Sequence, residues 1–376
     1  MVKETVSNGC DCESRRGVIW EIPRTEKDTP NRNKICGTLI LDMDGTLTVP
    51  GQDYEIEPEV VGELTSFLEG GGNLVFNTGA TTGRIEKTLL SKLYSEIDKK
   101  HGSKKANSFF DQVYLNPENG SALLIKKGIQ IEENELSFKW HKIHELHVPN
   151  KDKLRDILES EIISKNDDSY ILGDWSSEKE GKRDYIVTLK NIEDTLSLKK
   201  LIDSDEFKSK YPEVDWKNIL VKAARTSIDF IHKDSGKTIS TEWLLKELSL
   251  IGPVIGFGDL GDEFSKVVPT FNVNLIKPNE SRKRGMPAMD VIGGWSPLSE
   301  GNYTISDNNI VRDKRDNPIN VLLDSQGKIV KSENGDPMEI KPLVVRGDDG
   351  KDKVLAGAGK STAWMIHRLI EIGYFS

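Results

Sequence analysis

The chain is poor in cysteine, in long hydrophobic runs and in excess basic charge. Its three cysteines, Cys10, Cys12 and Cys36, are too few for a disulfide framework, which favours a reduced, intracellular compartment. Cys10 and Cys12 could hold a metal ion together, but their position favours a flexible tail. No apolar run approaches the roughly 20 residues that cross a bilayer, and the first residues contain no apolar signal segment. We therefore expect a cytoplasmic protein with no membrane partner.

The overall charge points away from polyanionic partners. The net charge is -9, which disfavours nucleic acid and anionic membrane surfaces. A hydrophobic share of 36% and a charged share of 30% are typical of a soluble globular protein, and 376 residues favour about two domains. An anionic small substrate would have to be attracted locally, and these properties leave the oligomeric state open.

The first half of the chain alternates strand and helix patterns. Residues 37–42 form an apolar run, and 57–69 carry apolar residues at helical spacing behind Pro58. Residues 73–77 and 112–116 predict further strands, with a helical stretch at 84–99 between them. This order predicts an α/β fold with a doubly wound, Rossmann-like parallel sheet.

The rest of the chain predicts an insertion followed by a return to the core. Residues 1–33 are polar and predict an N-terminal extension, and 34–137 form the first part of the core. Charged helices and short strands over 138–233 predict an inserted domain. Residues 234–376 complete the core, with a turn-rich, hairpin-like elaboration at about 296–350 and a final helix near the C-terminus.

Four polar clusters follow the predicted core elements in order. They are DMDGTLT (residues 42–48), NTG (77–79), Lys237 in DSGKT, and GDLGDE (258–263). Parallel α/β sheets bind ligands at the carboxyl ends of their strands, where three of these clusters stand. Together the clusters resemble the four motifs of the haloacid dehalogenase superfamily over residues 34–290.

The ENG at residues 118–120, followed by the insertion, resembles the superfamily branch with a large α/β cap of the C2 type. That branch includes Cof-type sugar phosphatases, sucrose- and trehalose-phosphate phosphatases and phosphomannomutase. The resemblance implies a Rossmann-like core with an inserted cap domain.

Two aspartates of the first cluster fit different chemical roles. Asp42, at the strand end, can attack phosphorus and form an aspartyl-phosphate. Asp44 lies two residues further on, on the same side of an extended chain, so it can protonate the leaving oxygen and then take a proton from water. We therefore predict Asp42 and Asp44 as the catalytic pair.

The other clusters supply charge for a phosphate and a metal. A hydroxyl, a close backbone N–H and a lysine suit a phosphoryl group, and carboxylates beside a phosphate require a hard cation such as Mg²⁺. The predicted phosphate-binding residues are Thr78, Gly79 and Lys237, and the expected Mg²⁺ ligands are Asp42, the Asp44 carbonyl and Asp259.

Two motifs depart from the pattern of the branch. Cof-type proteins usually have GDxxND in the fourth motif, whereas Asp262 and Glu263 stand at its last two positions here, and either could bind the metal directly or through water. In the second motif, Thr82-Gly83-Arg84 has the letters usual in the branch, but Thr78 stands at the strand end. We choose Thr78 on that ground and retain Arg84 as a substrate contact.

Weaker signals lie elsewhere. In the insertion, Trp175, Lys182 and Arg183 could contact a phosphosugar or belong to a solvated loop. GAGKST at residues 357–362 resembles part of a nucleotide-binding loop, but a turn before the last helix accounts for it better. His141, His144 and His147 predict a wet surface or a substrate contact more readily than a metal site.

Three functions remain open at this point. The favoured one is a Mg²⁺-dependent phosphatase that hydrolyses a small phosphorylated metabolite, such as a sugar phosphate, through phospho-Asp42. The second is a phosphomutase similar to phosphomannomutase, although that family usually has an arginine where Val49 to Gln52 stand here. The third is a catalytically silent regulatory protein, against which the intact Asp42, Asp44, Lys237 and Asp259 argue.

Overall fold

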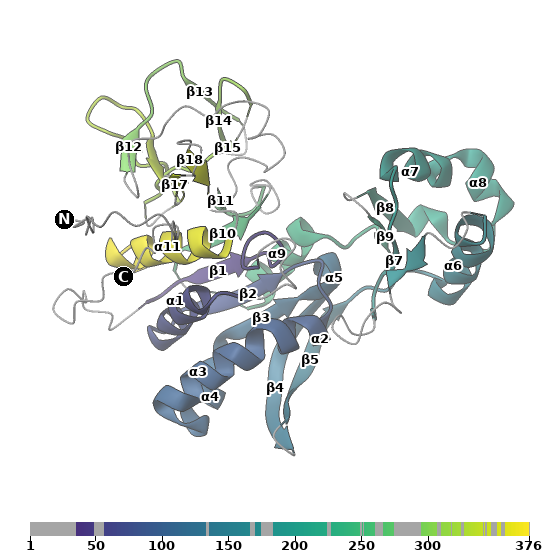
Figure 1. Cartoon of the computed structure of the whole chain (residues 1–376), viewed down its shortest axis with the longest axis horizontal. Helices are drawn as coiled ribbons and strands as arrows, with labels where there is room; N and C mark the ends of the chain where they lie inside the picture. Colours follow the sequence, from purple (N-terminus) through teal and green to yellow (C-terminus); the bar gives the residue numbers. More distant parts are fainter. Residues whose placement is uncertain are drawn as a thin grey trace, which may run out of the picture.

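The computed structural model places a seven-stranded sheet at the centre of the molecule (Figure 1). None of the described helices is both long enough and apolar enough to cross a membrane. The structure describes residues 35–48, 56–132, 135–165, 170–173, 183–223, 227–248, 250, 252–259, 266–273, 295–306, 310–316, 318–324, 327–340, 342, 344–346, 352–354 and 358–375.

The central sheet has the strand order β11-β10-β1-β2-β3-β4-β5. The pairs from β11 to β3 are parallel, and β3-β4 and β4-β5 are antiparallel. An antiparallel hairpin therefore extends one edge of a parallel sheet. The strands are β1 (Thr38–Leu41), β2 (Asn73–Asn77), β3 (Val113–Asn116), β4 (Ala122–Glu132), β5 (Glu135–Glu145), β10 (Val254–Gly258) and β11 (Thr270–Asn272).

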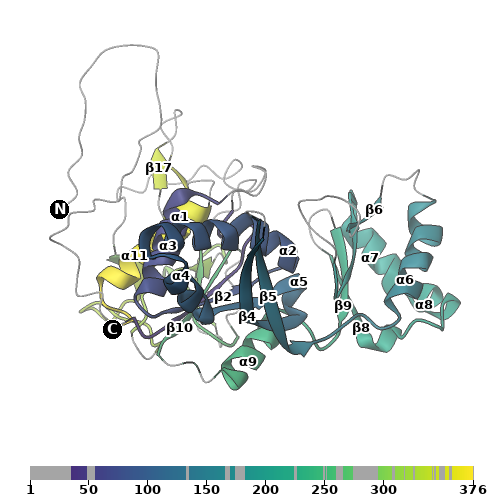
Figure 2. The ribbon, with the colours of Figure 1, turned by 90° about the horizontal axis from the view of Figure 1, so that it is seen from below.

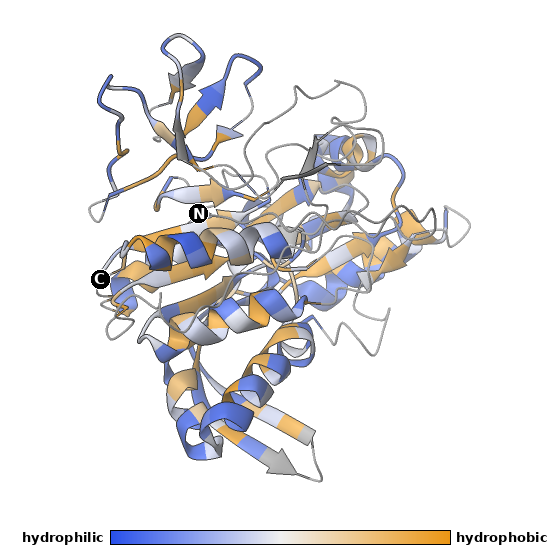
Figure 3. Cartoon of the chain, turned by 60° about the vertical axis from the view of Figure 1, so that its left-hand side comes forward, coloured by the Kyte–Doolittle hydropathy of each residue, from blue (hydrophilic) through white to orange (hydrophobic). Residues whose placement is uncertain are grey.

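Helices cover both faces of this sheet because alternate residues of its strands point to opposite sides. Leu39 and Leu41 of β1 share a core with the helices α1, α3 and α11, whereas Ile40 packs with Leu244 of α9 on the other face. Figure 2 shows α9 on the side of the sheet away from α1, α3 and α11, and in Figure 3 hydrophobic residues dominate the central strands. These helices are α1 (Pro58–Glu69), α2 (Thr82–Ile85), α3 (Ser91–His101), α4 (Ser103–Phe109), α5 (Pro117–Gly120), α9 (Lys237–Glu247) and α11 (Ala358–Glu371), and a π-helical turn (Glu86–Leu90) joins α2 to α3.

A second unit lies beside the carboxyl ends of the parallel strands, between β5 and α9 in the chain (Figure 1). It is an antiparallel sheet of order β6-β7-β9-β8, and one face of this sheet packs with helices in a separate hydrophobic core. Its elements are α6 (Lys151–Leu158), β6 (Ile171–Leu172), β7 (Val187–Lys190), α7 (Thr195–Asp203), α8 (Asp205–Lys210), β8 (Ile219–Ala223) and β9 (Ser227–His232).

Short hairpins form a third part beside β11 (Figure 1). Four of their buried residues, Val311, Val321, Leu323 and Ile340, join the main core cluster. The strands are β12 (Trp295–Pro297), β13 (Tyr303–Ile305), β14 (Val311–Asp313), β15 (Pro318–Ile319), β16 (Met338–Ile340), β17 (Val344–Arg346) and β18 (Asp352–Val354).

The predicted α/β fold is confirmed, with one difference at the edge of the sheet. The sequence places the start of an inserted domain at residue 138, yet β5 pairs with β4 as far as Glu145. Phe138 and Trp140 stack in one row with Phe110, so every second side chain of this charged segment faces the core. The division into domains, including an extension over 1–33 that lies outside the described residues, stays a prediction.

Candidate active site

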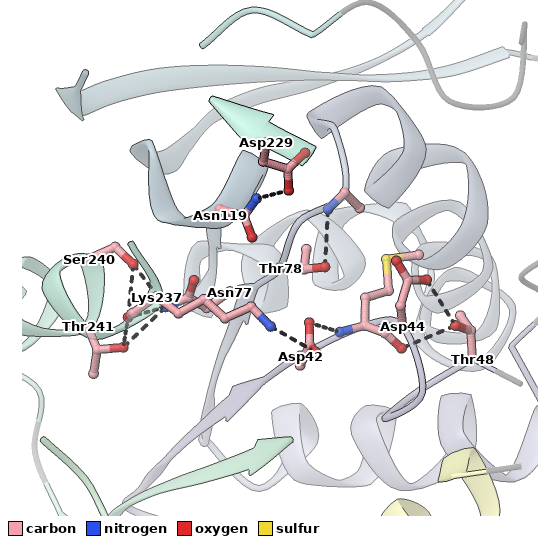
Figure 4. Close-up of polar contacts among 12 residues, drawn as sticks. Asp42, Asp44, Thr48, Asn77, Thr78, Asn119, Asp229, Lys237, Ser240 and Thr241 are labelled. Atoms are coloured by element: carbon pink, nitrogen blue, oxygen red, sulfur yellow. Dashed lines mark hydrogen bonds and ion pairs between the residues drawn. The ribbon is translucent and has the colours of Figure 1, made fainter. Parts of the chain in front are cut away.

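Asp42 lies at the carboxyl end of β1 and is buried, with 4% of its surface exposed. One carboxylate oxygen, Oδ1, accepts a hydrogen bond from the Met43 N–H at 2.7 Å. The other, Oδ2, is 2.9 Å from Nζ of Lys237, the first residue of α9 (Figure 4). The structure thus brings two predicted site residues, 195 positions apart in the chain, into one buried ion pair.

Asp44 turns to different partners. Its carboxylate forms a two-pronged ion pair with Arg84, in which Nη1 donates to Oδ2 at 3.1 Å and Nη2 pairs with Oδ1. The Thr48 hydroxyl donates to the same carboxylate at 3.4 Å. Gly45, with φ +77°, makes the turn between these groups, and a Cβ there would lie 3.1 Å from Asp259 Oδ2. Glycine is therefore needed both for the backbone angle and for the close approach of Asp259.

Asp259 completes a group of carboxylates at the ends of β1 and β10. Burial, with a further contribution from the charge of Asp42, raises the pKa of Asp259 to about 6, and Lys237 opposes that rise. The charge of Lys237 thus offsets only part of the effect of burial and of the charge of Asp42 on Asp259.

A hard cation with oxygen ligands fits the residues present. The Asp42 and Asp259 carboxylates and the Asp44 carbonyl would hold Mg²⁺, whose charge would offset both the burial of Asp259 and its repulsion from Asp42. Within the described ranges there is no set of three or more His, Cys, Asp or Glu side chains placed as metal ligands. That finding is compatible with two carboxylates and a backbone carbonyl.

Thr78 and Gly79 form a loop directly after β2. Thr78 is fully buried, and its hydroxyl oxygen accepts a hydrogen bond from the Ala80 N–H at 3.2 Å. Thr82 instead begins α2, where Thr81 caps the helix by accepting from the Arg84 N–H. Thr78 is therefore the residue that directly follows β2, whereas Arg84 of the TGR sequence pairs with Asp44.

Asn77 is a site residue that the sequence prediction left out, although NTG contains it. Its Nδ2 donates to the Lys237 carbonyl at 2.9 Å and to the hydroxyls of Ser240 and Thr241 at 2.9 and 3.1 Å (Figure 4). These contacts fasten the first turn of α9, which carries Lys237, to the end of β2. A polar residue at the last position of an apolar strand was the available signal.

The turn after β3 connects this site to the second unit. Asn119 donates from Nδ2 to Asp229 of β9 at 2.9 Å, and the Thr188 hydroxyl of β7 donates to the other Asp229 oxygen at 2.7 Å. Arg183 of the second unit reaches the Gly79 carbonyl at 3.0 Å. Of the predicted substrate contacts, Arg84 and Arg183 thus lie at the site, and Trp175 and Lys182 are outside the described residues. Asp262 and Glu263 also lie outside them.

Comparison with known proteins finds similar solved structures but no matching family model and no matching curated protein. Solved structures that resemble it include an ATP-bound IMP-nucleotidase from Plasmodium falciparum, at 13% identity and a TM-score of 0.42 over 63% of this chain and 57% of that one. A haloacid dehalogenase-like hydrolase from Bacteroides thetaiotaomicron matches at 19% identity and a TM-score of 0.39, over 62% of this chain and 85% of that one.

A C-terminally truncated form of the Plasmodium falciparum IMP-nucleotidase reaches a TM-score of 0.43 at 14% identity, over 67% of this chain and 70% of that one. The match to the ATP-bound nucleotidase covers 57% of that protein, so the chain spans less than two thirds of its length. Scores in this range do not establish a family or an activity.

Proposed function

We propose that the chain is a phosphatase of the haloacid dehalogenase type that hydrolyses a phosphoric monoester. The observation that supports this most strongly is the buried Asp42–Lys237 pair, 2.9 Å apart, beside the Thr78–Gly79 loop. A nucleophilic carboxylate, a fixed positive charge and a hydroxyl-bearing loop are what phosphoryl transfer requires, because most of its catalysis is positioning and charge stabilisation.

In the first step, an Asp42 oxygen forms a bond to phosphorus while the bond from phosphorus to the leaving oxygen breaks. Asp44, positioned by Arg84 and Thr48, enters this step in its protonated form and gives that proton to the leaving oxygen, which leaves Asp44 as a carboxylate. Lys237, the Thr78 hydroxyl and the Gly79 N–H hold the phosphoryl oxygens. The product of this step is an aspartyl-phosphate on Asp42 and a free alcohol.

In the second step, Asp44 takes a proton from a water molecule whose oxygen bonds to phosphorus. The bond between phosphorus and the Asp42 oxygen breaks, inorganic phosphate leaves, and Asp42 returns to a carboxylate. Bound Mg²⁺ would supply positive charge that allows the anionic phosphate to approach the carboxylates. Asp42, the Asp44 carbonyl and Asp259 would hold it, with Asp262 or Glu263 as further candidates.

We propose a small phosphorylated metabolite as the substrate, with sugar phosphates as the first class to test. The motif resemblance supports this class, and the net charge of -9 supports a substrate attracted by local cations over nucleic acid. A cytoplasmic location remains part of the proposal.

The test is release of inorganic phosphate from a panel of phosphorylated sugars and other metabolites with Mg²⁺, using Asp42→Asn as the blank. We expect at least one ester to be hydrolysed by the wild-type protein and by Asp152→Asn, a matched change at an exposed residue of α6. Asp42→Asn should lower the rate to the background. The proposal would be contradicted if no ester in the panel released phosphate, or if Asp42→Asn released it as fast as the wild-type protein.

The same panel separates a phosphatase from a phosphomutase. A mutase should convert a hexose phosphate into its isomer and should be activated by a hexose bisphosphate, with little release of free phosphate. Isomer formation under these conditions would replace the hydrolase proposal.

A further inference from the structure

The turn Glu118–Gly120 contacts both the proposed phosphate-binding loop and the second unit. All three residues have positive φ, at 49°, 60° and 71°. Two of them carry side chains, and such backbone persists only where its surroundings hold it. The Glu118 N–H donates to the Ala80 carbonyl at 2.9 Å, and the Asn119 N–H donates to the Thr78 carbonyl at 2.8 Å. The strained turn is therefore fastened to the proposed phosphate-binding loop.

The Glu118 side chain points the other way, into the chain segment that precedes β7. Its carboxylate accepts three consecutive backbone N–H groups, from Asp184 at 2.8 Å, Tyr185 at 3.0 Å and Ile186 at 3.1 Å. Glu118 is 1% exposed. Burial raises the pKa of this carboxyl, and the three N–H donors together with the charge of Arg183 oppose that rise. The carboxylate thus fixes the backbone of the segment next to Arg183.

Arg183 extends from that segment back to the loop. It is 8% exposed, and its Nη1 donates to the Gly79 carbonyl at 3.0 Å. Among the described residues, its Nε–H is buried and has no acceptor. A buried guanidinium donor without an acceptor is costly, and an anion at the loop would provide one.

The guanidinium is also well placed to act on such an anion. It donates a hydrogen bond to the carbonyl of Gly79, and the N–H of the same residue is proposed to bind the phosphoryl group. Arginine binds phosphate oxygens through several N–H groups in one plane, which Lys237 cannot do.

We propose that Arg183 is a phosphate-binding residue that the second unit contributes to the site, and that Glu118 is the positioning residue that holds it there. This inference rests on the proposed function, since it assigns Arg183 to the same phosphate. The second unit then completes the phosphate site in addition to covering it.

The competing interpretation is that Arg183 only clamps the second unit to the Gly79 loop. A clamp would lower stability, and any loss of phosphate affinity would then follow the loss of stability from one variant to the next. The experiment therefore measures inhibition by inorganic phosphate, with Mg²⁺ present and p-nitrophenyl phosphate as the substrate. It compares the wild-type protein with Arg183→Ala, Arg183→Lys, Glu118→Gln and the double variant Glu118→Gln/Arg183→Ala. Lys165→Ala, on an exposed residue of the second unit, removes one positive charge as a control.

We expect Arg183→Ala to raise the inhibition constant of phosphate about 10- to 100-fold, as for loss of a charged hydrogen bond. Arg183→Lys should recover part of this loss, and Lys165→Ala should change nothing. Glu118→Gln places an amide N–H group against backbone N–H donors, so it should weaken phosphate binding as well. Because Glu118 acts through Arg183, the double variant should bind phosphate no worse than Arg183→Ala alone.

Unchanged phosphate inhibition in Arg183→Ala, or fully additive losses in the double variant, would overturn the inference while leaving the phosphatase proposal intact. Thermal unfolding of each variant shows whether it folds. If Glu118→Gln does not fold, Lys151→Met replaces it, because the Lys151 ammonium donates to the Arg183 carbonyl. A wild-type protein that neither hydrolyses any ester nor binds phosphate would remove both proposals together.

Discussion

Asp42 and Asp44 are the same residue type two positions apart, and their surroundings differ. Asp42 is buried and paired with Lys237, whereas the side chain of Asp44 is 45% exposed and paired with Arg84. A buried carboxylate held beside a fixed cation suits a nucleophile that has to be aimed at phosphorus. A partly exposed carboxylate, in contact with solvent, suits a group that exchanges protons.

Replacing Asp44 tests this difference. Asp44→Asn keeps the shape but cannot carry the proton, so we expect kcat for a sugar phosphate to fall about 100- to 10,000-fold. The loss should be smaller for p-nitrophenyl phosphate, because its leaving group needs no proton. Steady-state rates on both esters check this. Equal rates for Asp44→Asn and wild type on the sugar phosphate would rule out the assigned role.

Asp259 predicts a dependence on pH and metal. Its pKa in the folded protein is about 6, against an ordinary value of 3.8. Between these values the folded state binds more protons than the unfolded state, so this group lowers stability as pH rises from about 4 to about 6. Asp259→Asn should therefore stabilise the metal-free protein at pH 7.5 by on the order of 1–3 kcal/mol, with less gain at pH 4.

Urea unfolding of both proteins at the two pH values, without metal, measures this difference. Mg²⁺ should raise the melting temperature of the wild type at pH 7.5, raise it less at pH 5, and leave Asp259→Asn unchanged. A metal-free Asp259→Asn that is less stable than wild type at pH 7.5 would contradict the repulsion argument.

At the scale of elements, the end of β2 and the start of α9 act as one piece. The Asn77 amide faces three acceptors on the first turn of α9, and among them is the carbonyl of Lys237 itself. The position of the lysine therefore depends on a strand 160 residues earlier in the chain.

We expect Asn77→Ala to lower stability by about 1–3 kcal/mol and to weaken phosphate binding, because buried acceptors lose their donor and α9 loses its anchor. Asn73→Ala is the matched control at the other end of β2, where the amide has one long contact of 3.4 Å to Thr38. Urea unfolding and phosphate inhibition measure the two effects. Similar losses in both variants would show that Asn77 has no special role.

The C-terminal helix α11 packs against the loop that follows Asp42. The Thr362 hydroxyl donates to the Thr46 carbonyl at 2.5 Å, and a Cβ on Gly359 would lie 2.8 Å from the Leu47 carbonyl. Gly359, the second glycine of GAGKST, is thus needed for close packing of the helix on the loop after Asp42. The helix begins at Ala358, so residues 358–362 of these letters are helical, and the prediction of a turn there before the last helix is wrong.

For the whole molecule, the hairpin region is attached to the open edge of the main sheet. Asn320 accepts from the Asn272 N–H at 2.6 Å and donates to the Asn272 carbonyl at 2.5 Å. The side-chain amide of Asn320 thereby forms the two hydrogen bonds that a neighbouring strand would form with Asn272 of β11. These bonds occupy backbone groups at the sheet edge that could otherwise pair with another chain.

Asn320→Ala should destabilise the protein by about 2–4 kcal/mol, because the Asn272 N–H and carbonyl lose their hydrogen bonds to the buried Asn320 amide. Asn302→Ala, at an exposed residue of the same region, should change stability by less than about 0.5 kcal/mol. Urea unfolding checks both values. A neutral Asn320→Ala would mean that the hairpins do not stabilise the sheet edge.

Residues at strand ends could be located from the sequence, and their partners could not. Asp42, Thr78 and Asp259 each follow a short apolar run, and the structure has them at the ends of β1, β2 and β10. The pairing of Arg84 with Asp44 could not be read from the sequence, and Glu118 and Asp229 were not predicted as site residues. Asn119 and Asp229 are 110 residues apart, a separation across which no periodic pattern carries information.

By itself, the sequence determined the order of strands and helices and pointed to the carboxylates and the lysine of the candidate site. Those properties depend on periodicities of two and 3.6 residues and on turn residues, all of which are local. The tertiary structure decided which charges pair, how Asn77 anchors Lys237, and how Glu118 brings Arg183 to the Gly79 loop. These contacts form only when segments more than 60 residues apart pack together. A buried charge or polar group is costly without a partner, and only the folded chain brings these partners within reach.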